Sequence, residues 1–250
     1  MKKQLLLTIG AAFILLFAAA QNGAHVEYKL SSDKGINGSM NLFFMDGNYR
    51  SEMKVAIPQM PAGGMNMVTI TQKDKPNTHY LLNESGKTYR EVVSGTEDKT
   101  KNENQDCEVT VLGKEKVGTY NCTHVSVKQG KTTYEMWTTT EVADYKNYQA
   151  KDGKYMGNEK VHKALIEKNA DGFAAKIVFL EEGGREGKMT MELIAFEKKT
   201  LTADLFQIPA GFTKADPAPS MMPAGMPDIK NMTPEERDKF IEQMKKQYGK

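Results

Sequence analysis

The chain has 250 residues, of which 39% are hydrophobic and 26% are charged, a composition that indicates a globular protein and excludes an intrinsically disordered one. Its 34 basic residues nearly balance its 32 acidic ones, and loss of Lys2 and Lys3 with a leader makes the two numbers equal. Because no net or clustered positive charge is left to attract a phosphate backbone, we predict no nucleic-acid partner.

The first twenty residues predict a secretory signal peptide. Lys2 and Lys3 precede an apolar run over residues 5–20, which ends in three alanines. A basic start, a short apolar middle and small residues at the cleavage point define such a signal, and the run is shorter than the ~20 residues that span a bilayer. We therefore expect a periplasmic or secreted protein whose mature chain starts near Gln21, without a lipobox cysteine and without a transmembrane segment after cleavage.

Residues 21–214 are predicted to form one domain, built mainly from antiparallel strands. Apolar and polar residues alternate over residues 49–57 and 189–196, which gives a strand one apolar and one polar face. Other short alternating segments are separated by turn signals such as Asp46-Gly47-Asn48. About ten strands at this spacing predict an antiparallel sheet of barrel or sandwich type.

Two cysteines, Cys107 and Cys122, lie in neighbouring predicted strands. The segment Gly113-Lys114-Glu115-Lys116 is predicted to form the turn between them, and a hairpin centred there places the two cysteines directly opposite each other. Opposite Cβ atoms lie ~4.5–5.5 Å apart, close to what a disulfide requires. We predict a structural disulfide; the alternative, a redox or metal pair, lacks the Cys-x-x-Cys spacing.

Two helices are predicted. The first covers residues 158–168 and carries Val161 and Leu165 on one face. The second, at residues 233–250, has an N-terminal capping box and an apolar stripe. The Pro- and Met-rich residues 215–232 between the last strand and this helix are predicted to be a linker. The terminal helix either docks on the sheet domain or engages an envelope protein as a partner.

Several motifs resemble a known family. The hairpin segment LGKEKVGTYNCT at residues 112–123 and the strand YEMWT at 134–138, together with the export signal, resemble an uncharacterised bacterial secreted family, domain-of-unknown-function family 4412. The phrase LFQIPAGF at 205–212 resembles the closing strand of the LolA/LolB-like lipoprotein-carrier superfamily. The resemblance covers roughly residues 25–214. It implies an unclosed antiparallel β-barrel (half-barrel) wrapped around a helical lid, with an apolar cavity in which carriers of this kind hold acyl chains. It assigns no catalytic residues.

Methionine is unusually frequent, with 16 residues concentrated at positions 60–67 and 221–226. Thioether sulfur suits Cu(I) or Ag(I), but flexible methionine also pads a ligand- or partner-facing apolar surface or an ordinary core. Since neither cluster contains His or Cys, we predict no metal site. The predicted ligand cavity is lined by Met53, Val55, Ile57, Met60, Met65, Met67, Trp137, Met189 and Met191.

Catalytic signals are lacking. The four histidines stand in no recognisable spacing with a nucleophile or another ligand, and the common hydrolase, metalloprotease and phosphate-loop motifs are missing from the sequence. We predict no enzyme and no cofactor, but an exported binding or carrier module for an acyl chain or other apolar ligand. The alternative is a non-catalytic structural or interaction protein whose barrel is filled by its own side chains. Metal binding through the Met-rich loops is a third, weaker interpretation.

Overall fold

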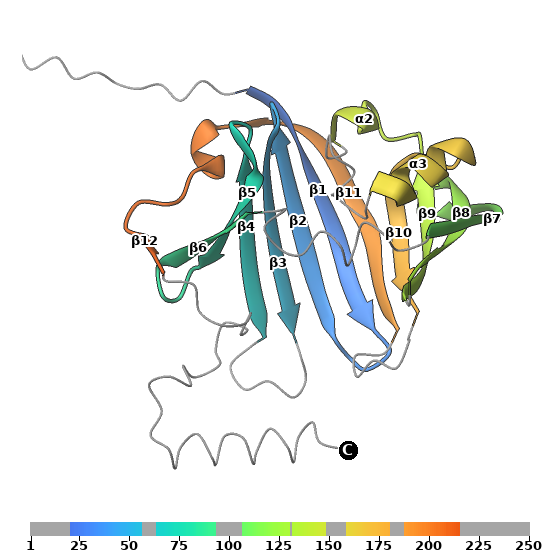
Figure 1. Cartoon of the computed structure of the whole chain (residues 1–250), viewed down its shortest axis with the longest axis horizontal. Helices are drawn as coiled ribbons and strands as arrows, with labels where there is room; N and C mark the ends of the chain where they lie inside the picture. Colours follow the sequence, from blue (N-terminus) through green and yellow to red (C-terminus); the bar gives the residue numbers. More distant parts are fainter. Residues whose placement is uncertain are drawn as a thin grey trace, which may run out of the picture.

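The computed structural model describes residues 21–56, 64–93, 107–130, 132–148, 159–180 and 188–215. These residues form a curved sheet of twelve strands that does not close on itself, so the fold is mainly β, as predicted (Figure 1). The strands are β1 (Gln21–Ser32), β2 (Asn37–Met45), β3 (Asn48–Ala56), β4 (Met65–Gln72), β5 (Lys75–Asn83), β6 (Thr88–Val93), β7 (Cys107–Val117), β8 (Tyr120–Gln129), β9 (Thr132–Thr139), β10 (Phe173–Phe179), β11 (Met189–Leu201) and β12 (Thr213–Lys214).

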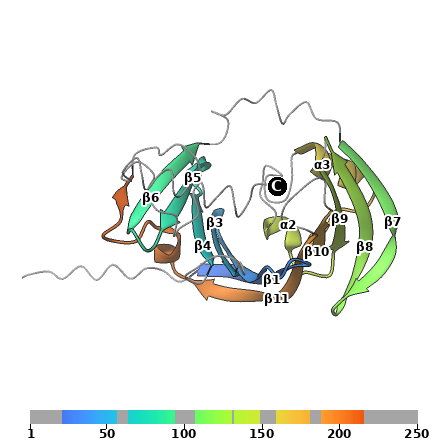
Figure 2. The same ribbon diagram turned by 90° about the horizontal axis from the view of Figure 1, so that it is seen from below.

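Two antiparallel meanders meet in the middle of the sheet. β1 to β6 follow one another to one edge, where the short β12 pairs with β6 in parallel. The second meander starts at the opposite edge with β7 and returns through β8, β9 and β10 to β11. β11 then pairs with β1 over the whole length of β1, from Gln21 opposite Leu201 to Ser32 opposite Met189. The result is an arch with two wings (Figure 2).

Local sequence explains the hairpin between β2 and β3. Asp46 and Gly47 both have positive φ, 48° and 81°, which is the backbone of a two-residue type I′ turn. This turn fixes the register of β3, so that Tyr49, Met53 and Val55 pack toward the core of the concave side. The alternation predicted for this strand is confirmed.

β-Bulges break the alternation in β11 and β7. In β11 the register shifts at Ile194, so that Leu193 pairs with Tyr28 and Phe196 pairs with Val26. Leu193 and Phe196 therefore both belong to the core of the concave face, although they are three residues apart. In β7 the shift falls at Leu112. β7 continues through the segment 113–116 that we predicted to be a turn, and the chain turns at Gly118, which has a φ of 55°.

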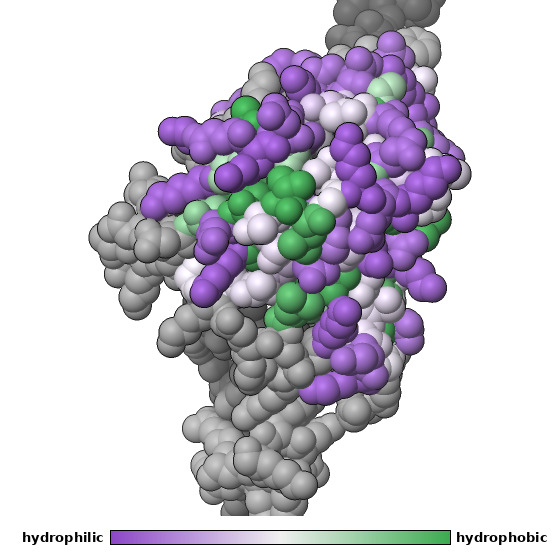
Figure 3. All heavy atoms as spheres, turned by 90° about the vertical axis from the view of Figure 1, so that its right-hand side faces the viewer, coloured by the Kyte–Doolittle hydropathy of each residue, from purple (hydrophilic) through white to green (hydrophobic). Residues whose placement is uncertain are grey.

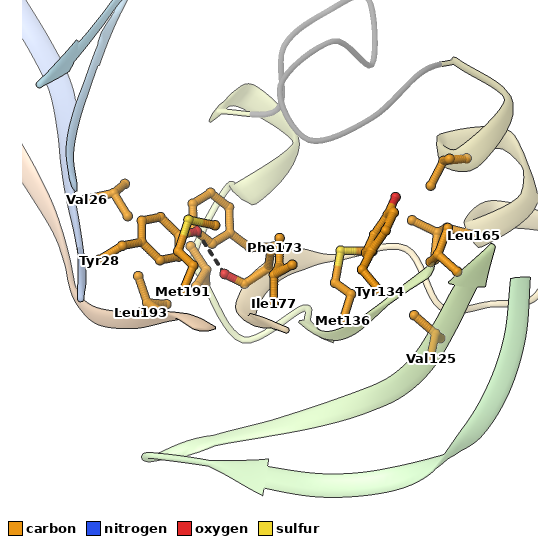
Figure 4. Packing of buried hydrophobic residues seen from close by; sticks show 14 of the residues in the cluster. Val26, Tyr28, Val125, Tyr134, Met136, Leu165, Phe173, Ile177, Met191 and Leu193 are labelled. Carbon is orange, nitrogen blue, oxygen red and sulfur yellow. Dashed lines mark hydrogen bonds between the residues drawn. The ribbon is translucent and has the colours of Figure 1, made fainter. Parts of the chain in front are cut away.

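The main core lies on the concave side of the arch. Two short helices, α2 (Tyr145–Tyr148) and α3 (Glu159–Glu167), lie on this side of the β7–β11 wing (Figure 2). Val161 and Leu165 of α3 belong to the core, which confirms the helix predicted at 158–168. Side chains from β1, β2 and β7 to β11 contribute to the same core, part of which is drawn in Figure 4. Within it the Tyr28 hydroxyl donates a hydrogen bond of 2.8 Å to the carbonyl oxygen of Ala174.

A separate core covers the convex side of the β3–β6 wing. Residues 205–212 were predicted to form a closing strand, but this prediction was wrong. The segment begins in a short 3-10 helix, η1 (Ala203–Phe206), and the residues after it form no strand up to residue 212. Phe206 packs against Ile70 and its neighbours on the convex face. Arg50 donates to the Leu205 carbonyl oxygen at 3.2 Å, and Gln72 donates to the Phe206 carbonyl oxygen at 3.0 Å. This wing therefore buries its convex face.

Several predictions concern parts of the chain outside the described residues. They are the signal peptide at 1–20, the linker after Ala215, the helix at 233–250, and two of the predicted cavity residues, Ile57 and Met60. In the described part of the chain, none of the helices has the length and apolar character needed to cross a bilayer.

Candidate ligand-binding face

Four methionines and a valine come together on the concave side of β2, β3 and β4. In the ladder Met40 lies opposite Met53, and Met53 lies opposite Met67; in the neighbouring row Val55 lies opposite Met65. Directly opposite residues share one face of a sheet, with Cβ atoms ~4.5–5.5 Å apart. We call Met40, Met53, Val55, Met65 and Met67 the methionine face.

The methionine face continues the rows of the main core. Met40 lies opposite Tyr28, and Tyr28 lies opposite Leu193, so one row of side chains runs across five strands from β11 to β4. In the second row Gly38 stands between Leu30 and Val55. Gly38 contributes no side chain there, and an added Cβ would lie 2.2 Å from the Lys54 carbonyl oxygen. The row is thus interrupted on β2, where the methionine face begins.

Burial separates the two ends of this continuous face. Tyr28, Ile177 and Met136 keep 0%, 2% and 4% of their surface exposed beneath the helices. Every member of the methionine face is only half-buried. Three of the members, Met40, Met53 and Val55, touch the edge of the main core. The methionine face is therefore an apolar surface attached to a filled core.

The other methionines of the predicted cavity lie elsewhere on the concave side. Met191 is 5% exposed and belongs to the main core, opposite Leu30 and Ile177. Met189 lies at the end of β11, opposite Ser32 and Phe179. Two strands, β1 and β2, separate β11 from β3 in the sheet. The structure thus brings Met53, Val55, Met65 and Met67 together, but not with Met189 and Met191.

Trp137 lies on the convex side, so its assignment to the predicted cavity was wrong. Its ring stacks on His124 with centroids 4.0 Å apart, and the Lys176 Nζ atom lies 4.6 Å from the ring centroid. Trp137 Nε1 donates a hydrogen bond of 2.9 Å to Glu115. The adjacent Met136 belongs to the concave core instead. Because neighbours in a strand point to opposite faces, only one of these two apolar residues can line the interior.

The polar groups around Trp137 satisfy one another. His124 lies between two carboxylates, with Nδ1 3.1 Å from Glu115 and Nε2 3.1 Å from Glu135. The hydrogen bond from Trp137 lowers the pKa of Glu115, and the nearby His124 acts in the same direction. The two carboxylates thus hold the imidazole in place on the convex face.

The predicted disulfide between Cys107 and Cys122 is contradicted, since both cysteines are free. Cys107 lies opposite Gln129, whereas Cys122 lies opposite Glu115. Eight positions along β7 separate Cys107 from Glu115, which corresponds to roughly 25 Å. The two thiols also face different cores, Cys107 the concave one and Cys122 the convex one around Trp137. Burial raises the pKa of each thiol.

A buried hydroxyl in the concave core was not foreseen from the sequence. Tyr134 is 5% exposed, and its hydroxyl finds no hydrogen-bond partner among the described residues. Burial raises the pKa of Tyr134 to about 12, with a smaller contribution from Cys107. The ring packs 5.7 Å from that of Phe179, in the part of the core that also contains Leu165 of α3 (Figure 4). Tyrosine in an alternating strand gives no signal for an unsatisfied hydroxyl.

A second apolar surface lies at the β7 edge of the sheet. Among the strands that the structure describes, β7 has a neighbour on one side only, and its Val111 and Leu112 are 43% and 50% exposed. Ile166 on α3 is likewise half exposed. On this side of the molecule apolar side chains gather between hydrophilic ones (Figure 3). An edge strand of this kind can pair with a strand of another chain.

Neither apolar surface has the chemistry of a metal centre built from the usual ligands. Within the described ranges, no three His, Cys, Asp or Glu side chains are placed to hold a metal ion. The methionine face carries no titratable or nucleophilic group of its own. It can bind a ligand through apolar and sulfur contacts.

Comparison with known proteins confirms the predicted family. Residues 24–212 match the family described as a domain of unknown function, DUF4412. No curated protein matches the chain.

Solved structures that resemble the fold share little sequence with it. An uncharacterised conserved protein from Thermus thermophilus is 10% identical, with 77% of this chain and 89% of that chain covered and a TM-score of 0.47. MucB from Pseudomonas aeruginosa, solved with MucA, is 9% identical over 75% and 56%, with a TM-score of 0.38. A LolA superfamily protein from Nitrosomonas europaea is 8% identical over 76% and 90%, with a TM-score of 0.26. This chain thus spans about half of the MucB chain, and likenesses of this size carry no functional argument.

Proposed function

The chain belongs to the DUF4412 family, and we propose that it is an exported module that binds or carries an acyl chain or another apolar ligand. The observation that supports this proposal is the methionine face, where five apolar side chains stand in register beside a filled core and remain half-buried. Unbranched, polarisable methionine adapts to ligands of varying shape. Each methylene group of a ligand that leaves water on this face contributes ~0.8 kcal/mol.

Binding without catalysis fits the chemistry of this surface. Apolar contact is all that the methionine face offers, and general acid, general base or nucleophilic catalysis needs a group that can move a proton or attack a substrate. We therefore propose no reaction and no cofactor. The basic, apolar and small-residue pattern of residues 1–20 supports export to the periplasm or the medium.

The alternative function is a structural or interaction protein of the bacterial envelope. The end of the concave face beneath α3 favours it, because Leu165, Phe173 and Ile177 fill that end with less than 8% of their surface exposed. The two functions differ in what the methionine face does. A carrier fills it with a ligand and releases the ligand again, whereas an interaction protein keeps it for a protein.

A fluorescent fatty acid tests the proposal. Trp137 cannot serve as the reporter because it lies on the convex face, so cis-parinaric acid should be titrated below its micelle threshold and followed by its own emission. We expect saturable binding to the wild type and at least tenfold weaker binding to Val55→Glu, because an unpaired charge among apolar side chains is strongly disfavoured.

Lys54→Glu is the matched control for this titration. Lys54 precedes Val55 in β3 but is exposed on the opposite face, so the same glutamate there should leave the affinity unchanged. Both variants should keep the wild-type circular dichroism spectrum. No saturable emission with the wild type, or equal affinities for the two variants, would contradict acyl binding on the methionine face.

A further inference from the structure

We propose that the C-terminal segment, residues 233–250, docks on the methionine face as an amphipathic helix and competes there with the ligand. The docking does not depend on the proposed function, whereas the competition with a ligand rests on it. The segment lies outside the described residues, so the argument combines its sequence with the place where the described chain ends.

The described chain ends beside the wing that carries the methionine face. β12 pairs with β6, and the Ala215 amide donates a hydrogen bond of 2.8 Å to the Tyr89 carbonyl oxygen. Three strand spacings separate β6 from β3, which is ~14 Å. A coil as long as residues 216–232 has an end-to-end distance of ~20–25 Å. The predicted linker is therefore long enough to bring the next segment onto the face.

The segment that follows has a complementary apolar side. Thr233, Pro234 and Glu236 give it the cap, first residue and capping-box acid of a helix. At a helical period its apolar residues form one stripe, which extends over ~12 Å from the first to the last of them. The three strands of the methionine face span ~10 Å. The stripe consists of Phe240, Ile241, Met244 and Tyr248.

A tethered segment is favoured over a separate partner as the occupant. A short tether gives its end an effective concentration in the millimolar range, so even weak apolar contacts keep it bound for much of the time. The rings of Phe240 and Tyr248 can make sulfur–aromatic contacts with Met40, Met53 and Met67. The docked helix then lowers the apparent affinity for a ligand by the fraction of molecules in which the face is open.

Photo-crosslinking of the full chain tests the docking. Benzoylphenylalanine in place of Phe240 should form crosslinks within one chain to peptides that contain Met40, Met53 or Met67. The same group in place of Lys246, on the opposite side of the predicted helix, should not reach them. Crosslinks only between chains, or only to peptides outside β2, β3 and β4, would overturn the proposal and assign the helix to a partner or another surface.

Titration with cis-parinaric acid tests the competition. In the full chain, the double variant Phe240→Ser/Ile241→Ser should bind the probe about threefold to tenfold more tightly, if the face is open in a third to a tenth of wild-type molecules. Lys239→Ser/Lys246→Ser, on the polar side, should bind like the wild type. Equal affinities for both double variants would overturn the competition.

The two proposals fail in different ways. Crosslinks to β2–β4 without probe binding to any variant would keep the docking and remove the proposed function. Probe binding that depends on Val55, without those crosslinks, would keep the function and remove the docking.

Discussion

The two ends of the concave face carry similar side chains under different cover. In the main core, Met136 and Met191 are 4% and 5% exposed, whereas Met53 and Met67 on β3 and β4 are only half-buried. Among the described residues, α2 and α3 lie over the β7–β11 wing (Figure 2). Curvature of the sheet brings apolar rows to one side, but burial follows only where a second layer covers them.

The β3–β6 wing can leave its concave face half-buried because its own core lies on the convex side. Val68, Ile70, Tyr80 and Leu82 pack there against Phe206 of η1. We therefore expect the stability of this wing to depend less on the methionine face than on the convex core. A surface freed from a structural role can exchange its occupant, and this is what a carrier requires.

The largest expected effect tests whether the convex core stabilises the β3–β6 wing. Phe206→Ala should lower the free energy of unfolding by ~3–5 kcal/mol, because it removes a large side chain that is 1% exposed from the convex core around Ile70. Urea denaturation gives the value. A loss below ~1 kcal/mol would mean that the β3–β6 wing is held from its concave side.

A matched pair of methionines compares the two ends directly. Met136→Ala should cost ~2–4 kcal/mol, since it opens a cavity in the filled core. Met67→Ala, on the methionine face, should cost less than ~1 kcal/mol. Both values come from the same denaturation experiment. Equal costs would show that both ends are filled alike, and would favour the structural alternative.

Alkali should destabilise the filled end. The pKa of Tyr134 is raised by burial from 10.0 to about 12, so its ionisation does not affect stability below pH 10 and costs stability as the pH rises from 10 to 12. Over this interval the free energy of unfolding of the wild type should fall by ~2 kcal/mol more than that of Tyr134→Phe, which lacks the ionisable group. Parallel pH profiles for the two proteins would place Tyr134 in contact with water.

The smallest effect concerns the same hydroxyl at neutral pH. Tyr134→Phe should raise the free energy of unfolding by ~1 kcal/mol, because a buried hydroxyl without a partner costs ~1–3 kcal/mol. Tyr28→Phe is the control: it removes the hydroxyl that donates to Ala174 and should lower stability instead. Destabilisation by Tyr134→Phe would show that this hydroxyl has a partner.

The sequence predicted the strands and the main helix where local signals are strong. Asp46-Gly47 marks the β2–β3 turn, because both positions of that turn have the positive φ angles that Asp and Gly tolerate. The alternation after the turn assigns Met53 and Val55 to one face. These two local rules were sufficient to place two of the five residues of the methionine face. The unclosed sheet also followed, through the family resemblance.

The errors arise where the register of a strand is set by more than its own sequence. β7 continues through a segment that has the composition of a turn, and the chain turns only between Val117 and Tyr120, so Cys122 lies opposite Glu115 and far from Cys107. The face of Trp137 could not be assigned from the sequence, because Met136 and Trp137 are both apolar and this wing buries both of its faces. Periodicity cannot assign a face when both faces are apolar. Register depends on pairing with distant strands, which a single sequence does not specify.

Site-specific labelling by the ligand itself tests the central claim, that the half-covered end of the concave face binds an apolar chain. Palmitic acid with a diazirine on its acyl chain should be irradiated with the full-length protein and the adducts mapped by mass spectrometry. We predict adducts on peptides that contain Met40, Met53 or Met67, and strong reduction of these adducts in Val55→Glu but not in Lys54→Glu. Adducts confined to β7–β10, or unchanged by Val55→Glu, would contradict the account.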